Sequence, residues 1–417
     1  MNAILDFIPV FFRPALNALF AFLFTVSAFF SPVQPAPARH VLNESDFLHT
    51  RGTRIVNAAN NEIYLRGTNA GGWLVFEQWM CAIENAPDQQ TIISTLTERF
   101  GEETCDELLD VYRDNFWQEQ DFDNCAELGL NVIRLPFNVY SFASADGVLK
   151  DDIFSRLDWF VDNCGKRGIY VILDMHGAFG SQNGNDHTGI INDGRQLYYN
   201  AENRAKTIAL WTRIAEHYKD NPAVAGYDLL NEPTADTGST GEMQWDFYDE
   251  LYDAVRAVDP NHIIIMEACW TFLDLPHPLR YGWKNVMYEY HYYAWDHDKE
   301  PEFIKLHTAM QIIATGAMLH NVPVLVGEFT FFDQADAWHY GLDSFNKVKW
   351  NWTTWTYKIL GTSSWGLYNY FPEDEGYFPG RADILNDSEA TIREKWSKIG
   401  TDYCVPGTMQ GIIRQYF

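Results

Sequence analysis

Positive charge is scarce in this chain of 417 residues. Lys and Arg number 30 against 57 Asp and Glu, so the formal net charge at pH 7 is -27. A surface that binds nucleic acid or an anionic membrane needs clustered cations to displace counterions. We therefore expect no nucleic acid as a partner and, once a signal segment is removed, no membrane.

Other missing patterns narrow the choice of function. The sequence has no internal repeat, low-complexity tract or Ser/Gly linker, which argues against a separate binding module. It has no HExxH motif and no Cys/His set with metal-ligand spacing, so we expect neither a metal nor another cofactor, although Asp174, His176, Asp186 and His187 lie close together. Ser181 lacks the Gly-x-Ser-x-Gly elbow of a serine hydrolase.

Long hydrophobic runs are missing except near the N-terminus. Arg13 precedes an apolar run over residues 15–30, and Ala36-Pro37-Ala38 has the small-x-small pattern that signal peptidase accepts. We predict a signal peptide over residues 1–38 and a mature chain over residues 39–417. The alternative is an uncleaved signal anchor, but the run is shorter than the roughly 20 apolar residues of a spanning helix.

The cysteine content fits an exported protein. In an oxidising compartment, an even number of cysteines allows one to three disulfides, in up to 15 full pairings. The six cysteines are Cys81, Cys105, Cys125, Cys164, Cys269 and Cys404.

Short runs of β-branched and aromatic residues alternate with longer amphipathic stretches from about residue 53 onward. This alternation is typical of βα units on a parallel sheet. Eight units predict an α/β fold: a single-domain (β/α)8 TIM barrel with a short N-terminal β-hairpin. The predicted strands are 63–69, 131–136, 169–175, 225–230, 262–266, 285–290, 323–327 and 364–368, and three of the predicted helices are 151–167, 203–218 and 243–258.

Polar residues gather at the ends of the predicted strands. In a βα barrel the active site lies at the carboxyl ends of the strands, so these residues are the candidates for chemistry. Two of them are glutamates, Glu232 and Glu328, on separate strands. The others are Arg134, Asp174, His176, Asn231, His291, Tyr293 and Trp365.

Paired carboxylates at a barrel mouth suit glycoside hydrolysis, in which one carboxyl group protonates the leaving oxygen and the other attacks or stabilises the oxocarbenium-like centre. This chemistry needs two different pKa values. A cationic Arg134 near Glu328 would keep Glu328 ionised as the nucleophile, whereas less compensated surroundings would keep Glu232 protonated as the general acid.

Four further residues have supporting roles in this interpretation. Asn231 would hold the 2-hydroxyl group of the sugar, a contact that strengthens in the transition state. His291 and Tyr293 would set the orientation and protonation of the two glutamates. Trp365 would offer a flat apolar face to the sugar bound beside the nucleophile.

The order and local sequence of these residues resemble the signature of glycoside hydrolase family 5, in the clan A barrels. The resemblance covers nearly the whole mature chain and makes residues 39–417 the catalytic domain. It implies a retaining mechanism through a covalent glycosyl-enzyme, with Glu232 as acid/base and Glu328 as nucleophile. The matching supporting residues are Arg134, His176, Asn231, His291, Tyr293 and Trp365.

Within the family, residues 67–79 and 176–186 look most like the fungal exo-β-1,3-glucanase group. In that group, the residue matching Glu77 helps to hold the terminal glucose, and the loop 181–186, with Asp186 at its end, would help to wall off a pocket. Aromatic residues near strand ends are further candidates for sugar contacts: Trp73, Trp79, Trp270, Trp295, Phe331 and Phe332. The predicted substrate-binding residues are Glu77, Trp73, Asp186, Trp295 and Trp365.

The sequence departs from the glucanase group in two segments. Residues 185–189 lack the aromatic residue that usually precedes the aspartate and the Asn-Ser that follows it, which leaves the linkage preference open. Residues 350–358 differ from the usual sequence before the eighth strand. At this helical position, we expect their four aromatic side chains to belong to the core rather than to a sugar-binding face.

These observations predict a secreted, extracellular, monomeric retaining β-glucan hydrolase that acts on neutral polysaccharide or oligosaccharide, with glucan exo-1,3-β-glucosidase activity in polysaccharide catabolism. One alternative is an endo-β-1,4-glucanase (cellulase) of the same family, which open loops after the third and seventh strands would favour. Another is a catalytically inactive carbohydrate-binding barrel, against which the presence of both glutamates counts.

Overall fold

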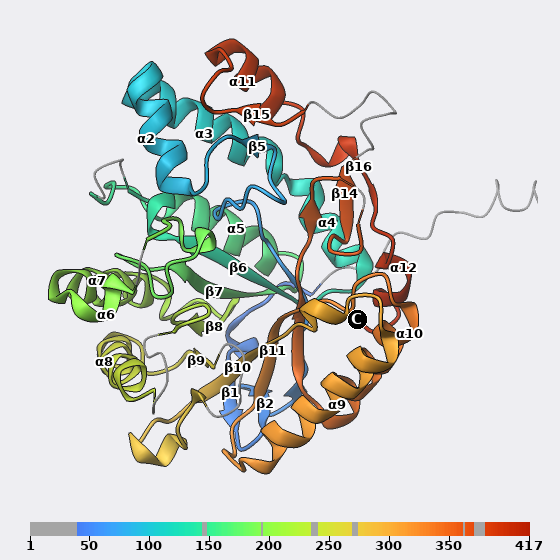
Figure 1. Ribbon diagram of the computed structural model, residues 1–417. Coiled ribbons are helices and arrows are strands. Elements are labelled where there is room, and N and C mark those ends of the chain that lie inside the picture. Colours follow the sequence, from blue (N-terminus) through green and yellow to red (C-terminus); the bar gives the residue numbers. More distant parts are fainter. Residues whose placement is uncertain are drawn as a thin grey trace, which may run out of the picture. The chain divides into compact units, whose positions relative to one another are not determined.

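Eight parallel strands close into a barrel in this computed structural model, which describes residues 40–143, 148–192, 195–234, 241–268, 274–361, 363–370 and 380–417 (Figure 1). Around the barrel, the order is β10-β11-β12-β4-β6-β7-β8-β9. The barrel strands are β4 (Arg66–Asn69), β6 (Val132–Asn138), β7 (Tyr170–Gly177), β8 (Val224–Asp228), β9 (Ile263–Glu267), β10 (Val286–Tyr292), β11 (Val324–Phe329) and β12 (Asn351–Thr354). The predicted (β/α)8 fold is confirmed.

Seven predicted strands overlap barrel strands, but the eighth prediction, 364–368, is wrong. The eighth barrel strand is β12, which pairs in parallel with β11 and β4. The buried side chain of Asn351 joins these neighbours, because it accepts a hydrogen bond from Leu65 N at 2.9 Å and donates one to Val324 O at 3.0 Å. The helix predicted from the aromatic residues around β12 is absent, because a buried strand shows the same continuous apolar character as a buried helix.

Helices cover the outside of the barrel (Figure 1). They are α2 (Gln89–Phe100), α3 (Glu102–Phe116), α4 (Glu119–Leu128), α5 (Ser155–Gly165), α6 (Gln196–Tyr199), α7 (Ala201–Tyr218), α8 (Glu242–Val258), α9 (Pro301–Ala317), α10 (Ala335–Val348), α11 (Glu389–Trp396) and α12 (Gln410–Ile413). The three helices predicted over residues 151–167, 203–218 and 243–258 correspond to α5, α7 and α8. Helix α5 begins later than predicted because the Asp152 carboxylate accepts hydrogen bonds from the backbone N–H groups of Phe154 and Ser155.

The predicted N-terminal hairpin is present. Strands β1 (Leu48–Arg51) and β2 (Arg54–Asn57) pair in antiparallel fashion, and β3 (Glu62–Ile63) extends them. Leu48 and Ile55 pack with residues that begin the barrel strands, among them Val132 and Ile263. The hairpin therefore covers the amino-terminal end of the barrel and leaves the carboxyl end for the site.

Two small sheets lie outside the barrel. One pairs β5 (Ile83–Glu84) with β15 (Ala382–Asp383). The other contains β13 (Lys358–Ile359), β14 (Tyr368–Tyr370) and β16 (Cys404–Pro406), so the run predicted as the eighth strand contributes only Tyr368 to a strand. The short 3-10 helices are η3 (Glu44–Asp46), η4 (Val139–Ser141), η5 (Asp186–Thr188), η7 (Pro278–Arg280), η8 (Trp295–His297) and η10 (Thr401–Tyr403).

The cysteine residues that the structure describes form none of the disulfides that the sequence allows. Cys81, Cys105, Cys125 and Cys164 are buried free thiols, and Cys404 is a half-buried one. Each of Cys81, Cys105 and Cys404 donates to a backbone carbonyl group instead. Burial raises the pKa of the Cys81 and Cys404 thiols to about 12. Cys269 lies outside the described residues.

The N-terminal predictions are not tested by the structure. Residues 1–39 lie outside the described part of the chain, so the signal peptide over residues 1–38 and the domain boundary after it stay predictions. The described residues all belong to one compact unit, His40–Phe417. Within the described ranges, no helix combines the length and the apolar character needed to span a bilayer.

Candidate active site

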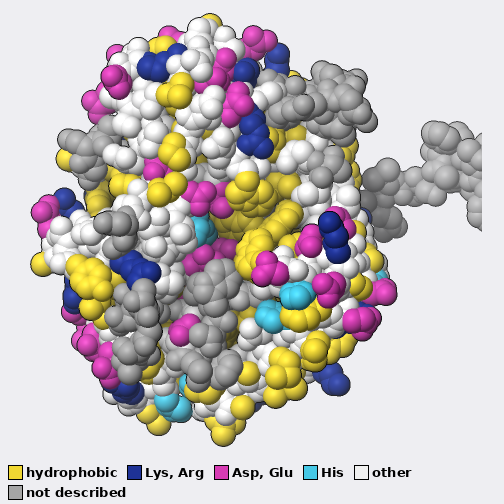
Figure 2. All heavy atoms as spheres, in the orientation of Figure 1, with side chains coloured by type: hydrophobic (Ala, Val, Ile, Leu, Met, Phe, Trp, Pro, Cys, Tyr) yellow, Lys and Arg dark blue, Asp and Glu magenta, His cyan; other side chains and the backbone are white. Residues whose placement is uncertain are grey.

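The carboxyl ends of the barrel strands surround a cavity of about 490 Å³. Figure 2 shows acidic and histidine side chains inside a hollow on this face, next to a group of hydrophobic side chains. The cavity is lined by Glu77, Trp79, His176, Asn185, Asp186, His187, Asn231, Glu232, Tyr293, Trp295, Glu328, Trp355 and Trp365. Most of the predicted site residues therefore meet in one place.

Glu328, on β11, is held by one cation and one hydroxyl group. Arg134 Nη1 donates to Glu328 Oε1 at 2.9 Å, and Tyr293 OH donates to Oε2 at 3.0 Å. Burial raises the pKa of Glu328, whereas the nearby His291 and Arg134 lower it. The donated bonds fix the carboxylate and stabilise its ionised form.

Glu232 follows β8 in a less compensated setting. His291 Nδ1 lies 2.8 Å from Glu232 Oε1, and burial raises the pKa of this carboxyl group. The Glu232 backbone has a φ of 44°, in the left-handed region that non-glycine residues rarely adopt, and its N–H donates to Glu267 Oε2 at 2.7 Å. The Glu232 side chain is thus buried, and the hydrogen bond to Glu267 fixes its backbone.

The two glutamates lie close together. Ligand atoms of Glu232, His291 and Glu328 all lie within 4.8 Å of one another. Retaining glycosidases place their carboxyl groups roughly 5–5.5 Å apart, whereas inverting enzymes need more space for a water molecule. The selected oxygens of Glu232 and Glu328 are closer together than the carboxyl groups of an inverting pair.

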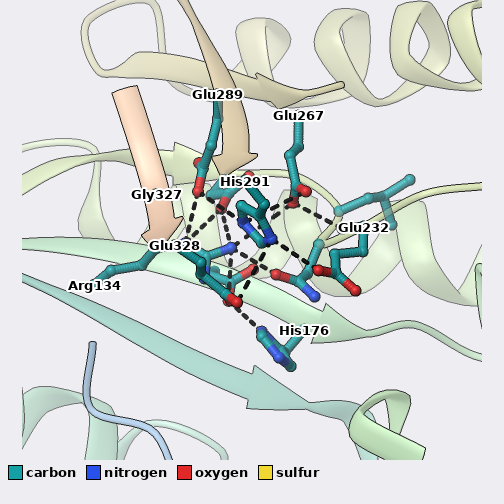
Figure 3. Close-up of polar contacts among 12 residues, drawn as sticks. Arg134, His176, Glu232, Glu267, Glu289, His291, Gly327 and Glu328 are labelled. Carbon is teal, nitrogen blue, oxygen red and sulfur yellow. Dashed lines mark hydrogen bonds and ion pairs between the residues drawn. The ribbon is translucent and has the colours of Figure 1, made fainter. Parts of the chain in front are cut away.

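Arg134 lies beside Glu328 (Figure 3) and also donates a hydrogen bond to Asn231, so it connects the two sides of the site. Arg134 is fully buried on β6 and donates through Nη2 to Asn231 Oδ1 at 2.8 Å and to Asp228 Oδ2 at 2.7 Å. The amide nitrogen of Asn231 is buried and has no hydrogen-bond partner among the described residues. It is therefore available to a ligand in the cavity.

His176 lies one residue before the end of β7 and forms part of the cavity wall. Its Nδ1 lies 2.8 Å from Asp174 Oδ2, and its ring stacks on Trp355 at 5.4 Å. Burial lowers the pKa of His176 well below its usual value. A neutral imidazole at this position can exchange hydrogen bonds with a sugar hydroxyl group.

Three tryptophans line the entrance. Trp295 and Trp365 stack with ring centroids 5.5 Å apart, and Trp79 meets Trp365 edge-on at 5.4 Å. Trp295 is 54% exposed and Trp79 is 41% exposed. Large exposed aromatic faces beside a polar cavity suit the C–H faces of a sugar ring. Trp365 reaches the cavity from the segment before β14 rather than from the end of a barrel strand.

Glu77 and Asp186 also line the cavity, as predicted. Glu77 Oε2 accepts a hydrogen bond from Trp79 Nε1 at 2.7 Å. Burial, supported by the charges of Asp186, Glu328 and Glu232, raises the pKa of Glu77 to about 8. Glu77 is therefore largely protonated at neutral pH and can donate as well as accept hydrogen bonds.

Trp73 does not reach the cavity, contrary to the prediction. It is fully buried, and its Nε1 donates to Arg113 O at 2.9 Å while its ring packs against Trp159 and Phe160. Phe331 is also buried, against Trp338 and away from the cavity. By contrast, Phe332 meets Trp365 edge-on at 5.7 Å. Trp270 lies outside the described residues.

Two lining residues were missed by the sequence analysis. Trp355 directly follows β12, so a correct eighth strand would have placed it among the strand-end candidates. His187 was considered only as a metal ligand, yet its Nε2 lies 3.6 Å from Glu232 Oε2 and 2.8 Å from Asn183 Nδ2.

Two groups of described residues have donor atoms close enough to hold a cation. They are Glu232, His291 and Glu328, and Glu267, Glu289 and His291. Both share His291, and the Arg134 guanidinium already supplies positive charge to Glu328 and Glu289 at 2.9 and 3.1 Å. The expectation of no metal and no cofactor stays a prediction.

Comparison with known proteins identifies the class to which this barrel and its site belong. The family described as Cellulase (glycosyl hydrolase family 5) matches residues 88–361. The chain therefore belongs to glycoside hydrolase family 5, as its sequence resemblance indicated.

Individual relatives carry several names. A beta-xylosidase of Phanerodontia chrysosporium is 34% identical over 252 residues, which cover 60% of this chain and 52% of that protein. A probable glucan 1,3-beta-glucosidase A of Emericella nidulans is 30% identical, over 64% of this chain and 67% of that protein. The chain thus spans about half to two thirds of the length of these curated relatives. A rutinosidase structure from Aspergillus niger shares the fold, with a TM-score of 0.60, 17% identity, and coverage of 80% of this chain and 98% of that one.

Proposed function

We propose that the protein is a retaining β-glucan hydrolase with glucan exo-1,3-β-glucosidase activity. The observation that carries the proposal is the approach of Glu232 and Glu328 to within 4.8 Å at the barrel mouth, with Arg134 bound to Glu328 alone of the two. The names of the glucan 1,3-beta-glucosidase relatives support the reaction and the substrate class.

The proposed mechanism has two steps. In the first, the Glu328 carboxylate attacks the anomeric carbon while Glu232 gives its proton to the departing glycosidic oxygen, which leaves a glycosyl ester on Glu328. In the second, Glu232 takes a proton from water, and the resulting hydroxide displaces Glu328 from the anomeric carbon. The configuration at that carbon is retained, and both glutamates return to their starting states.

The remaining residues bind the sugar in this proposal. The free amide N–H of Asn231 meets the 2-hydroxyl group, and Trp355 and Trp365 supply ring faces. Glu77 and Asp186 close the side of the cavity where a chain end would stop. The negative charges of Asp186 and of the Glu328 carboxylate exclude acidic sugars and favour a neutral polysaccharide or oligosaccharide.

Export and oligomeric state belong to the proposal as well. We infer that the protein is secreted as a monomer, and this rests on the apolar run and the Ala36-Pro37-Ala38 triplet of the N-terminal segment together with the acidic composition. N-terminal sequencing of the protein from culture medium checks the cleavage site, which is expected after residue 38. Light scattering checks the monomer.

A product time course tests the substrate proposal. Purified protein from residue 39 onward is given laminarin, barley β-glucan, carboxymethyl cellulose and mannan. Glucose as the only early product from laminarin, with little loss of viscosity, is the expected result. Early oligosaccharides from cellulose or mixed glucan would instead indicate an endo-β-1,4-glucanase. No hydrolysis of any substrate, including aryl β-glucosides, with binding retained, would indicate an inactive carbohydrate-binding barrel.

A second candidate activity is β-xyloside hydrolysis, because the relative with 34% identity is named a beta-xylosidase. Xylose differs from glucose by the missing hydroxymethyl group at C5. The ratio of kcat/KM for 4-nitrophenyl β-glucoside and β-xyloside distinguishes the two. A ratio well above one supports the glucosidase, and a ratio below one supports the xylosidase.

A further inference from the structure

A second cavity, larger than the active site, is lined mainly by α3, α5 and the segments next to them. This α3–α5 cavity has a volume of about 690 Å³, and none of its described lining residues also lines the cavity at the barrel mouth. Ligand sites commonly have volumes of about 300–1,000 Å³. The α3–α5 cavity is therefore a separate space that is large enough for a ligand.

Arg113, on α3, lines this cavity as a buried cation without a hydrogen-bond partner. Only 6% of the residue is exposed. None of its three side-chain nitrogens donates a hydrogen bond to a described residue, and its closest ion pair joins Nη1 to Asp110 Oδ1 at 3.9 Å. Buried polar groups are normally hydrogen-bonded, because leaving them unpaired is costly. The Arg113 guanidinium is thus available to a molecule in the cavity.

The lining acids of α3 are paired with cations from the opposite wall instead. Arg156, on α5, donates to Asp110 Oδ1 at 2.6 Å and to Asp114 Oδ1 at 2.8 Å. Lys150 binds Asp106 in the same way. Burial, together with the charge of Arg156, lowers the pKa of Arg113 to about 10, so that Arg113 is still charged at neutral pH.

Three tryptophans line the same cavity. Trp73 and Trp117 are fully buried, and the Trp117 Nε1–H is a second buried donor without a partner among the described residues. Trp159 is half-buried, and its ring packs against Trp73 with centroids 5.8 Å apart and against Phe122 at 5.1 Å. These contacts fix an aromatic side chain beside the charged groups, an arrangement that suits the C–H face of a sugar ring.

The charges of the lining indicate the class of ligand. Five acids face three cations, and this excess of negative charge disfavours an anion, while Arg113 disfavours a cation. A neutral molecule with many hydroxyl groups satisfies both kinds of partner, because each hydroxyl accepts from a guanidinium and donates to a carboxylate. The acids are Asp106, Asp110, Asp114, Glu119 and Asp152, and the cations are Arg113, Lys150 and Arg156.

We propose that the α3–α5 cavity is a second carbohydrate-binding site, which holds a neutral β-gluco-oligosaccharide through Arg113 and Trp159. The site is separate from the catalytic one, and only the choice of a β-glucan as its ligand rests on the proposed function. Binding there holds a polysaccharide on the enzyme while the active site cleaves it, which raises the local concentration of chain ends.

Calorimetric titration with laminarihexaose tests the second site. The titration uses Glu328→Gln, in which the proposed nucleophile is removed so that the ligand is not hydrolysed. Adding Arg113→Met to this protein is expected to remove one bound hexasaccharide per chain, because methionine keeps the aliphatic part of the side chain but not its donors. The same stoichiometry and affinity with and without Arg113→Met would overturn the proposal and leave the cavity to water.

Ser155→Trp repeats the test without altering a buried group. Ser155 is exposed at the first residue of α5 and lines the cavity, so an indole ring there would occupy the space. The same loss of one hexasaccharide per chain is expected. Unchanged binding in this variant would contradict the proposed position of the ligand, even if Arg113→Met does not fold.

Arg66→Met is the matched control. Arg66 begins β4, and its Nε is also buried without a partner among the described residues, but Arg66 does not line the cavity. Both binding events are expected to remain. Loss of a hexasaccharide in this variant would show that removal of any such arginine suffices, which would contradict a specific role for Arg113.

Hydrolysis by proteins that keep Glu328 separates the second site from catalysis. Arg113→Met is expected to hydrolyse 4-nitrophenyl β-glucoside as the wild type does and to lose about threefold or more in kcat/KM on laminarin, mainly through KM. An equal loss on both substrates would overturn the polysaccharide-holding role. If the wild type hydrolyses no glycoside, the proposed function fails, whereas the titration still decides whether the second site exists.

Discussion

At the scale of single residues, the site gives two similar carboxyl groups different partners. Glu328 receives hydrogen bonds from Arg134 and Tyr293, whereas Glu232 contacts the neutral His291. The proposed roles of an ionised nucleophile and a protonated acid require such different surroundings for the two carboxyl groups. Both glutamates, and most of their partners, could be predicted from the sequence, because each stands at the end of a recognisable strand.

Glu328→Ala is expected to abolish turnover while the fold remains intact, because alanine cannot form the glycosyl ester of the proposed mechanism. Added azide should restore hydrolysis of an activated aryl glucoside and give the product of inverted configuration. Activity assays, circular dichroism and NMR of the glycosyl azide provide the measurements. Wild-type activity in this variant would remove Glu328 from its proposed role.

Glu232→Ala should spare substrates with good leaving groups far more than natural glycosides, since only poor leaving groups need a proton. The loss on natural glycosides is expected to be about 10²–10⁴-fold, the usual contribution of general acid catalysis. Rates for a series of aryl glucosides with different leaving-group pKa values measure the effect. Equal losses across the series would argue against acid catalysis by Glu232.

Glu77 should make stability depend on pH. Burial and nearby acids raise its pKa from 4.5 to about 8 in the folded protein, so between these values the folded state binds more protons than the unfolded state. Its contribution to stability is therefore present below pH 4.5 and is lost as pH rises toward 8. Thermal unfolding from pH 4 to 9 should show Glu77→Gln gaining stability over the wild type as pH rises, whereas a constant difference would contradict the raised pKa.

At the scale of elements, the strands were predictable where β-branched runs are bounded by turns and hard to place where aromatic residues dominate. Around β12, the aromatic residues fit a helix as well as a buried strand, and only pairing with β4 and β11 decides between them. Because the eighth strand was misplaced, Trp355 was not recognised as a residue at a strand end. The burial of Trp73 was equally unpredictable, because its proximity to a strand end does not show which way its side chain points.

Asn351→Ala tests the importance of β12. The change leaves Leu65 N–H and Val324 C=O without their buried partners, and each such loss costs about 1–3 kcal/mol. Urea unfolding should show a decrease in the free energy of unfolding of that order. A decrease below about 0.5 kcal/mol would mean that water or a backbone shift replaces both bonds.

At the scale of the whole molecule, stability comes from the barrel core, the helices packed around it and the N-terminal hairpin. Four of the five cysteines that the structure describes contribute as buried apolar groups, and none of the five forms a crosslink. A disulfide framework allowed by an even cysteine count is not needed in a chain of this size, which buries a large core.

A reductant should therefore leave the melting temperature unchanged. Thiol titration of the native protein should detect little reaction at the four buried positions, and denaturation should make all five thiols reactive. A clear fall in melting temperature on adding dithiothreitol would indicate a stabilising disulfide and contradict this account.

The central claim is that Glu328 forms the covalent intermediate at the mouth of this barrel. The most direct test is to incubate the wild-type protein with 2,4-dinitrophenyl 2-deoxy-2-fluoro-β-glucoside, digest it and locate the label by mass spectrometry. The account predicts one fluoroglucosyl group per chain, on Glu328. An unlabelled protein that hydrolyses aryl glucosides, or a label on another residue, would contradict it.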